Sequence, residues 1–274
     1  MRERVWVNMN KKISFLGCGN MAQAMINGVV KAKLFDNSNV MATDFDVNKT
    51  NYIKETLGIS TSNDNNEAVK FADIIVLCVK PQHIKSLLAD IKDDITSNQT
   101  IVSIAAGVDI KTLESLIGND KKIVRVMPNT PALVGEGASA LCKNNNVTEE
   151  EFKEIVDMFS SFGVAEVVTE NLIDAVVGVS GSSPAFVYMF IEALADGAVL
   201  EGLPRDKAIK MAAQAVLGSA KMVLETGEHP GKLKDNVCSP AGTTIEAVYA
   251  LEKNNFRGTV IEAVHKAAEK NRNM

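Results

Sequence analysis

Residues 16–22 read Leu16-Gly17-Cys18-Gly19-Asn20-Met21-Ala22, a Gly-x-Gly-x-x-Ala motif between a short apolar run and a segment with helical spacing. The first glycine of such a motif permits a tight turn, and the second lets the backbone approach a pyrophosphate because it has no side chain. Ala22 allows the following helix to pack on the strand, and the N-terminus of that helix favours an anion. The motif therefore predicts a dinucleotide site, the alternative being an ordinary tight turn between strand and helix.

Short apolar runs recur after this motif, separated by segments of helical spacing. The runs show little alternation with polar residues, which is typical of strands covered by helices on both faces. Strands that alternate with helices form a doubly wound parallel sheet with right-handed crossovers. We therefore predict an α/β fold with an N-terminal Rossmann-type domain, residues 12–169, and buried parallel strands at Ile13–Leu16, Val40–Thr43, Ile74–Val79, Ile101–Ala105 and Ile123–Met127.

The strand pattern stops after Val164–Val168, and the remainder of the chain has helical stripes of alanine, valine, leucine and methionine. The clearest helix follows Pro204, which suits a first turn, and Gly227 can end it. Small residues on this helix permit close contact between helices, within the chain or with a second subunit. We predict an all-helical substrate and dimerisation domain at residues 170–274, and a disordered extension or lead-in to the first strand at residues 1–11.

Charge and composition narrow the class of partner. Lys and Arg sum to 29 against 34 Asp and Glu, and the net charge of −5 provides no basic face for nucleic acid or anionic lipid. The longest charge-free apolar stretch, Ala175–Ile191, is interrupted by glycine, serine and proline and does not match a membrane span of roughly 20 residues. No secretory signal opens the chain, so we expect a cytoplasmic protein.

The four cysteines are far apart and accompanied by only three histidines, so we expect reduced thiols and no metal site.

One acidic residue bears on the choice of cofactor. Asp44 stands at the end of the second predicted strand, where a carboxylate accepts hydrogen bonds from an adenosine ribose and repels a ribose phosphate. This position favours NADH. Against it, Asp46 could take the same role, Lys49 could bind a phosphate, and either acid could cap the next helix. The residues alone leave the cofactor open between NADH and NADPH.

A second polar segment lies in the helical domain, where Ser239-Pro240-Ala241-Gly242-Thr243-Thr244 precedes a new helix. Thr243 as N-cap with Glu246 three residues later predicts a capping box, and the open backbone N–H groups at that end suit a small carboxylate. Asn236 and the Thr244 hydroxyl are uncharged groups that could orient a ring nitrogen. The alternative is a well-capped surface helix.

Three further loops follow predicted strands at the edge where ligands bind open parallel sheets: Lys80-Pro81-Gln82, Ala105-Ala106-Gly107 and Pro128-Asn129-Thr130-Pro131. Each could instead be a helix-initiating turn, since proline, glycine and asparagine are common there. Their occurrence at one edge makes them candidates for ligand contact. No catalytic histidine is expected: His83 should face solvent, and the other two lie beside a proline turn and on the last helix.

Taken together, these motifs resemble the pyrroline-5-carboxylate reductase family, from about Lys12 to the last helix. The segment at residues 239–244 is the most specific, because it separates this family from other nicotinamide enzymes with a similar two-domain plan. The other motifs that carry the resemblance are Gly17-Cys18-Gly19-Asn20-Met21-Ala22, Val79-Lys80-Pro81, Ser103-Ile104-Ala105-Ala106-Gly107, Met127-Pro128-Asn129-Thr130-Pro131 and Ser180-Gly181-Ser182-Ser183-Pro184-Ala185.

The resemblance implies an oxidoreductase that uses NADPH or NADH to reduce the ring imine of 1-pyrroline-5-carboxylate to L-proline, the last step of proline biosynthesis. Glu170, Asn236, Thr243 and Thr244 would border the substrate, with backbone amides on its carboxylate and the Thr244 hydroxyl, as the catalytic group, on the ring nitrogen. Catalysis would then be mostly positioning. The residues that would line the dinucleotide are Leu16, Gly17, Gly19, Asn20, Met21, Asp44, Asn65, Val79, Lys80 and Ala106.

The chain departs from the family pattern at three positions. Ser183 and Ala241 stand where the family usually has glycine, and an added Cβ can shift a tight turn that needs a positive φ. Asp44 stands where many relatives carry a small polar residue, which weakens the expectation of NADPH. The resemblance also implies a homodimer through the helical domain, with larger rings such as a decamer.

Two alternatives accompany this interpretation. One is a related two-domain reductase for another cyclic imine or a small hydroxy acid, which would offer a catalytic lysine among Lys207, Lys210 and Lys221, although their spacing is typical of a solvent face. The other is a catalytically inactive dinucleotide-binding regulatory protein, since fold alone does not establish chemistry. The intact polar residues of the 236–244 segment argue against an inactive protein.

Overall fold

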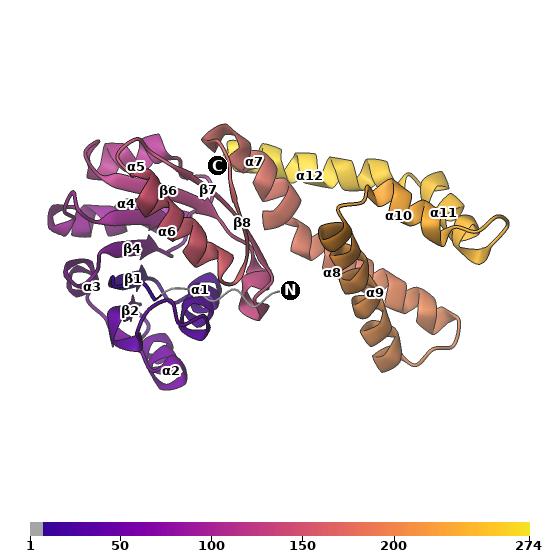
Figure 1. Ribbon diagram of the computed structural model, residues 1–274, viewed down its shortest axis with the longest axis horizontal. Helices are drawn as coiled ribbons and strands as arrows, with labels where there is room; N and C mark the ends of the chain where they lie inside the picture. Colours follow the sequence, from indigo (N-terminus) through magenta and orange to yellow (C-terminus); the bar gives the residue numbers. More distant parts are fainter. Residues whose placement is uncertain (1–7) are drawn as a thin grey trace. The chain divides into compact units, whose positions relative to one another are not determined.

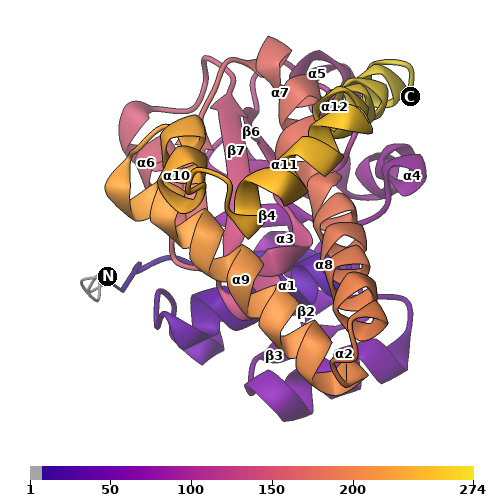
Figure 2. The same ribbon diagram turned by 90° about the vertical axis from the view of Figure 1, so that its right-hand side faces the viewer.

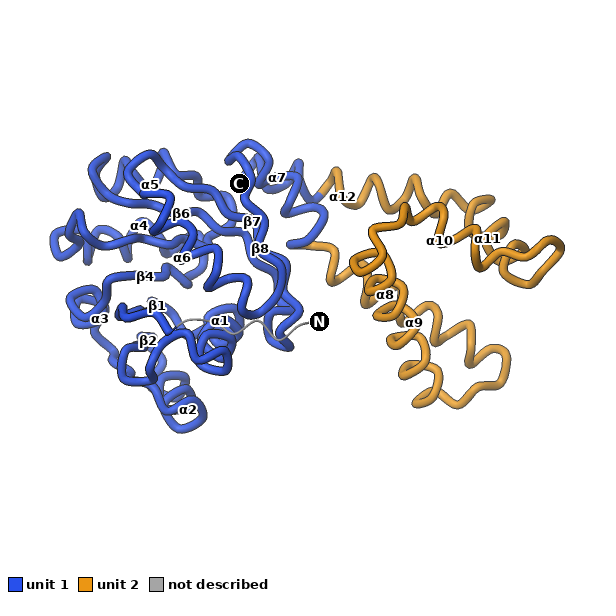
Figure 3. The backbone as a smooth tube through the Cα atoms, in the orientation of Figure 1, with its two compact units in different colours: residues 1–181, 267–274 blue, residues 182–266 orange. Residues whose placement is uncertain are grey.

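The computed structural model describes residues 8–274 and divides the chain into two compact units (Figure 3). Unit 1 contains the described residues up to Gly181 together with 267–274, and unit 2 contains 182–266. The division falls later than the predicted limit at 169 because Ile173 is buried in the core of unit 1. Asn271 also fastens the end of the chain to unit 1, where its Nδ2 donates to Oδ1 of Asp174 at 2.7 Å. Most of the predicted N-terminal extension lies outside the described residues.

Unit 1 is built on one eight-stranded sheet in the order β3-β2-β1-β4-β5-β6-β7-β8 (Figure 1). The first six strands along the chain pair in parallel, β7 runs antiparallel to β6, and β8 is parallel to β7. The strands are β1 Ile13–Leu16, β2 Val40–Thr43, β3 Ser60–Ser62, β4 Ile74–Leu77, β5 Thr100–Ser103, β6 Lys122–Met127, β7 Gly137–Lys143 and β8 Gly163–Val167.

The sheet differs from the prediction at two strands. The five predicted parallel strands are present as β1, β2, β4, β5 and β6, but β3 and β7 are built from small and polar residues and show no apolar run. The predicted parallel arrangement does not extend to β7. Its connection from β6 contains only the short 3-10 helix η3, Thr130–Val134, and a parallel crossover needs about a dozen residues or more.

Both faces of the sheet are covered, because successive strand residues point to opposite sides. Phe15 belongs to one buried cluster with residues of α1 and α6, whereas Leu16 belongs to the other with residues of α4 and α5. The helices of unit 1 are α1 Asn20–Lys31, α2 Val47–Leu57, α3 Asn65–Phe71, α4 Pro81–Ile91, α5 Ile110–Ile117, α6 Glu149–Ser160 and α7 Ile173–Val176, with the short turns η1 Asn37–Asn39, η2 Lys92–Asp94, η3, η4 Glu170–Leu172 and η5 Val177–Gly181.

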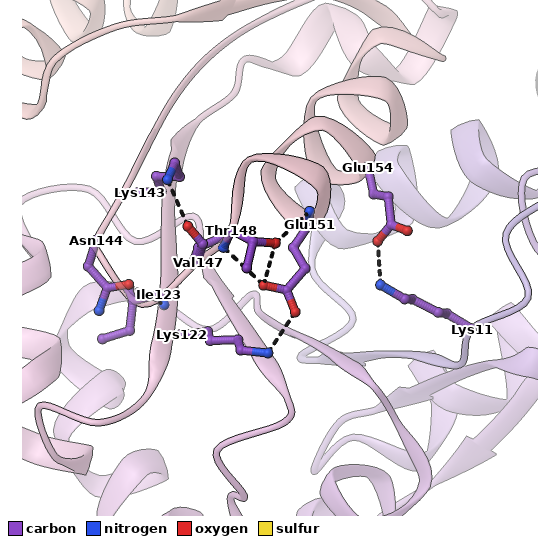
Figure 4. Close-up of polar contacts among 9 residues, drawn as sticks. All are labelled: Lys11, Lys122, Ile123, Lys143, Asn144, Val147, Thr148, Glu151 and Glu154. Atoms are coloured by element: carbon purple, nitrogen blue, oxygen red, sulfur yellow. Dashed lines mark hydrogen bonds and ion pairs between the residues drawn. The ribbon is translucent and has the colours of Figure 1, made fainter.

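A capping box fixes the start of α6 (Figure 4). The backbone N of Glu151 donates to Thr148 Oγ1 at 3.2 Å, and the backbone N of Thr148 donates to Glu151 Oε2 at 3.0 Å. Lys122 on β6 donates to Glu151 Oε1 at 2.6 Å. Burial raises the pKa of Glu151, but the hydrogen bonds from Lys122 and Thr148 outweigh it, and the pKa lies below its ordinary value. The box therefore ties α6 to the edge of the parallel strands.

Unit 2 is helical throughout its described length and contains α8 Ser183–Leu200, α9 Arg205–Thr226, α10 Pro230–Val237, α11 Thr243–Lys253 and most of α12 Phe256–Arg272. The helices α8 and α9 lie side by side (Figure 2) and share a small core of Ala195, Ala208 and Ala212. The predicted helix after Pro204 is α9, and Gly227 ends it at φ +66°. Small residues at the contact let the two helices approach closely.

One helical run among the described residues, Glu170–Leu200, is long and apolar enough to cross a membrane by length and composition. Within this run, Val177–Gly181 forms the π-helical turn η5, Ser182 is a bend, and Pro184 lies in the first turn of α8, which proline tolerates. The predicted interruption is therefore present at Ser182, between η5 and α8. Only 6% of its most apolar stretch is buried within this single chain.

Candidate active site

Two glycines shape the turn after β1 in different ways. Gly17 has φ +109°, and an added Cβ would lie 3.1 Å from the carbonyl O of Cys78, so a side chain here would be strained. The backbone N of Gly17 donates to Thr43 O at 2.7 Å, and that of Cys78 donates to Leu16 O at 2.9 Å, which joins the turn to β2 and β4. Gly19 is the N-cap of α1, and no atom lies within 4 Å of an added Cβ. The turn therefore presents open backbone at a helix N-terminus, as a pyrophosphate requires.

A pocket opens beside this turn, where β1 lies between β2 and β4 and the order of the strands along the chain reverses. Ligands of open α/β sheets bind at such a switch point. Three lining residues were not predicted as cofactor residues: Thr43, which was assigned only to a strand, Phe45, which no pattern marks, and Asn63, which follows the unpredicted strand β3. The lining residues are Gly17, Thr43, Asp44, Phe45, Asn63, Asn65 and Val79, which include four of the predicted cofactor residues.

Asp44 is held by the backbone around it. Its Oδ2 accepts from the backbone N of Cys18 at 2.8 Å, and its Oδ1 accepts from that of Asp46 at 3.0 Å. Lys49 Nζ lies 3.8 Å from the same Oδ1. Asp46 has a different role, because its Oδ1 accepts from the backbone N of Asn48 at 3.0 Å and caps α2. Of the two acids, Asp44 lines the pocket and Asp46 caps the helix.

The other predicted cofactor residues lie at the same edge of the sheet. Asn65, which lines the pocket, accepts from Thr43 Oγ1 at 2.6 Å through its Oδ1. Lys80 is the exposed N-cap of α4, and Pro81 follows it in the first turn, so this loop also initiates a helix. Leu16 ends β1, Asn20 and Met21 open α1, and Ala106 follows β5.

Cys18, in the middle of the turn, is a neutral thiol. Burial raises its pKa to about 12, and the Asp44 carboxylate adds to this effect. Its Sγ donates to Thr43 O at 3.3 Å. Burial also raises the pKa of Cys142 to about 11 and places that of Cys78 well above its ordinary value. Since the thiolate is the reactive form, these cysteines supply no nucleophile.

We expect Cys18 to resist alkylation in the folded protein at about pH 8. A pKa raised from 9.0 to about 12 lowers the thiolate population about a thousandfold. Treatment with iodoacetamide followed by peptide mass spectrometry measures the modification, with the denatured chain as control. Equal rates for Cys18 in the folded and the denatured protein would contradict its placement in a buried turn.

Glu170 lies in unit 1, at the start of η4. Its Oε1 accepts from Arg125 NH1 at 3.0 Å and from the backbone N of Ile110 at 2.8 Å. The side chain of Arg125 is 8% exposed, and that of Glu170 is 35% exposed. These contacts join β6, the first turn of α5 and η4. Glu170 thus positions the segment that follows the loop after β5, and its contact with substrate stays a prediction.

The polar segment of unit 2 connects α10 to α11. The N-cap of α11 is Gly242, and no side chain caps this end. The predicted capping box of Thr243 and Glu246 is therefore wrong, because the helix begins one residue earlier than expected and Thr243 already lies in its first turn. The first backbone N–H groups of α11 lack a side-chain partner at the cap, which suits a carboxylate. Thr244 is half-buried, and Asn236 and Thr243 are exposed.

The two departures from glycine have different consequences. Ala241 has φ +55°, in the left-handed region that favours glycine, so its Cβ carries a conformational cost. An added Cβ at the next residue, Gly242, would lie 2.2 Å from Ser239 Oγ. Ser183 is the first residue of α8 and is not among the described residues with positive φ. The expected difficulty therefore applies to Ala241 alone.

Asn129 and His229 make hydrogen bonds that stabilise the local backbone. Asn129 donates from Nδ2 to Ser180 O at 3.0 Å and accepts at Oδ1 from the backbone N of Ala138 at 2.8 Å, so it fastens the loop after β6. His229 caps α10, where its Nδ1 accepts from the backbone N of Gly231 at 3.0 Å. The other two histidines, at 83 and 265, are exposed. Within residues 8–274, no group of three or more His, Cys, Asp or Glu could hold a metal ion.

Comparison with known proteins covers both parts of the chain. A family model described as "Pyrroline-5-carboxylate reductase dimerisation" matches residues 170–274, and one described as "NADP oxidoreductase coenzyme F420-dependent" matches residues 12–107. The pyrroline-5-carboxylate reductase of Escherichia coli (strain K12) is 49% identical over 262 residues, which cover 96% of this chain and 97% of that protein. The enzyme of Methanosarcina acetivorans is 46% identical and covers 97% of this chain and 98% of its own length.

A solved structure of a pyrroline carboxylate reductase is also similar to this chain over nearly its full length. The Plasmodium falciparum pyrroline carboxylate reductase with NADP bound has a TM-score of 0.88 and 37% sequence identity, covering 97% of this chain and 98% of that one. A glycine turn at a switch point, an acid-lined pocket and a helical second unit define a two-domain nicotinamide-dependent reductase. The chain belongs to the pyrroline-5-carboxylate reductase family, as the motifs predict. Its reaction is the NAD(P)H-dependent reduction of 1-pyrroline-5-carboxylate in proline biosynthesis.

Proposed function

We propose that the chain performs this reduction by positioning its two reactants, without a dedicated general acid. The observation that carries the proposal is the open backbone at Gly19 beside the pocket that Asp44 lines. When bound, NAD(P)H supplies the hydride that reduces the ring imine. The turn fits this group, because Gly19 leaves room for a pyrophosphate and the N-terminus of α1 favours its charge. A protonated imine is already electrophilic, so orientation can supply much of the rate enhancement.

Different predicted residues would bind different parts of the dinucleotide. Gly17, Gly19 and Asn20 would hold the pyrophosphate at the turn, and Asp44 with Asn65 would hold the adenosine ribose. Val79, which follows β4, lines the same pocket as Asp44 and Asn65. Lys80 and Ala106 follow β4 and β5 and would border the nicotinamide half. Leu16 and Met21 would support the turn from the ends of β1 and α1. This assignment is supported by the shared edge of the sheet and by the pocket.

The substrate would be oriented by the N-terminus of α11. Backbone amides at Thr243 and Thr244 would bind its carboxylate, since this helix end carries no side-chain cap. The Thr244 hydroxyl would hydrogen-bond the ring nitrogen, which makes Thr244 the proposed catalytic residue, and Asn236 would support this contact. Glu170 would border the substrate as well as position α5.

The assembly we propose is a homodimer through the helical domain, with a decamer as a larger form, in the cytoplasm. Support comes from the dimerisation family matched by residues 170–274. Apolar side chains also stay exposed in a single chain, and exposed apolar patches are typical of subunit interfaces. Those on the helices of unit 2 include Tyr188, Met189, Met211, Leu224, Tyr249 and Ile261.

The proposed reaction is tested by incubating the purified protein with 1-pyrroline-5-carboxylate and reduced cofactor. We expect substrate-dependent oxidation of NADH or NADPH with an equal amount of L-proline, and no oxidation when the substrate is omitted. Oxidation with another cyclic imine or a small hydroxy acid but not with 1-pyrroline-5-carboxylate would favour a related reductase. Cofactor binding without turnover on any of these would favour a regulatory protein.

A further inference from the structure

We infer that this chain prefers NADH to NADPH, with Asp44 as the residue that discriminates and Phe45 as the surface on which the adenine stacks. The inference rests on the proposed function, because it takes the pocket beside the β1–α1 turn as the adenosine end of the cofactor site. NADH and NADPH differ only at this end, where the ribose carries either a hydroxyl or a phosphate.

The position of the Asp44 carboxylate is fixed before any ligand binds. Two backbone amides, of Cys18 and Asp46, donate to its two oxygens at 2.8 and 3.0 Å. The side chain of Asn63 holds the backbone of the same residue, donating from Nδ2 to Asp44 O at 2.6 Å. The Asp44 side chain is 15% exposed, so it cannot swing away from a ligand without losing these bonds. A hydroxyl can donate to such a carboxylate, whereas a phosphate can only accept and is repelled.

The charges around the pocket favour the same cofactor. The lining residues include no lysine or arginine, and Asp44 is the ionisable residue among them. Lys49, with a half-exposed side chain, has its Nζ 3.8 Å from Asp44 Oδ1, so this cation compensates the carboxylate already present. A ribose phosphate would add about −1.5 to −2 charge. One shared lysine does not balance both anions.

Phe45 would bind the adenine base, the other half of the adenosine. It lines the pocket next to Asp44, yet its side chain is 86% exposed, the highest exposure among the large apolar residues recorded as exposed. A flat aromatic face beside a ribose site suits a nucleobase, because stacking of a base on an aromatic side chain stabilises binding. Stacking of this kind does not distinguish NADH from NADPH, since both carry adenine.

The test measures the binding of NADH and NADPH by fluorescence titration, in parallel with kcat/KM for each cofactor. We expect the native protein to favour NADH by about tenfold or more, and Asp44→Ser to shift the NADH:NADPH ratio toward NADPH by about tenfold or more. Asp46→Asn is the matched control, since it removes a charge two residues away and keeps the helix cap; it should change the ratio less than about twofold. Phe45→Ala should weaken both cofactors by a similar factor of about ten.

Two results would overturn the inference: a native preference for NADPH, or a ratio that Asp44→Ser leaves unchanged. Phe45→Ala binding both cofactors as tightly as the native protein would remove the adenine contact. The titrations do not depend on turnover. Tighter binding of NADH without reduction of 1-pyrroline-5-carboxylate would therefore support the inference and contradict the proposed function.

Discussion

Thr244→Ala is expected to lower kcat for the reduction of 1-pyrroline-5-carboxylate by about 100- to 1000-fold, the usual effect of removing one positioned hydrogen-bonding group from a reacting centre. Thr244 is the second residue of α11 and is half-buried. Alanine is a good helix former, so the helix should persist without the hydroxyl. Dinucleotide affinity, measured by fluorescence titration, should stay within about twofold of the native value, because the glycine turn belongs to unit 1.

Thr244→Ser provides the matched control, because serine keeps the hydroxyl and loses only a methyl group. Its kcat should lie within about tenfold of the native value. Equal losses of turnover in both variants would indicate that the methyl group and local packing matter, and not the hydroxyl. A parallel loss of dinucleotide binding in Thr244→Ala would mean that the residue is structural.

Gly163→Ala is expected to lower the free energy of unfolding by roughly 3–5 kcal/mol, a large part of the ordinary stability of a domain. Gly163 begins β8 and pairs with Gly137 at the start of β7. An added Cβ would lie 2.0 Å from the carbonyl O of Gly137 and 2.5 Å from its C and N. These are backbone atoms within a strand pair, so they cannot move away without breaking the ladder.

Gly135→Ala separates the clash from the backbone conformation. Gly135 has φ +80°, but no atom lies within 4 Å of an added Cβ. Its replacement should therefore cost about 1 kcal/mol, the penalty of the left-handed conformation alone. Urea denaturation of both variants measures the difference. Similar losses of stability in the two proteins would contradict the close approach of β7 and β8.

The sequence predicted the parts of the fold in which one physical signal dominates. Largely apolar runs identified the buried strands β1, β4 and β5, because a strand covered on both faces is built mostly from apolar residues. The strands β3 and β7 gave no such signal. β3 consists of Ser60–Ser62 and has partly buried residues, and β7 depends on small side chains that fit a close pairing with β8.

The candidate site was predicted where chemistry and local spacing coincide. Gly17 and Asp44 were predicted from a glycine motif and from a carboxylate after the second strand, and both residues line the pocket. Phe45 and Asn63 were missed, since their importance comes from a pocket that the fold of the chain creates. The helix cap at 243 was wrong by one residue, because the boundary depends on the conformation of Ala241 and Gly242.

The most direct test of the central claim follows a labelled hydride from cofactor to product. The protein is incubated with 1-pyrroline-5-carboxylate and nicotinamide cofactor that carries two deuterium atoms at the hydride-donating carbon, separately as NADH and as NADPH, and the proline formed is analysed by mass spectrometry and NMR. We predict L-proline with one deuterium at the δ carbon, the former imine carbon. Proline without deuterium, or no proline with either cofactor, would contradict direct hydride transfer to the ring imine.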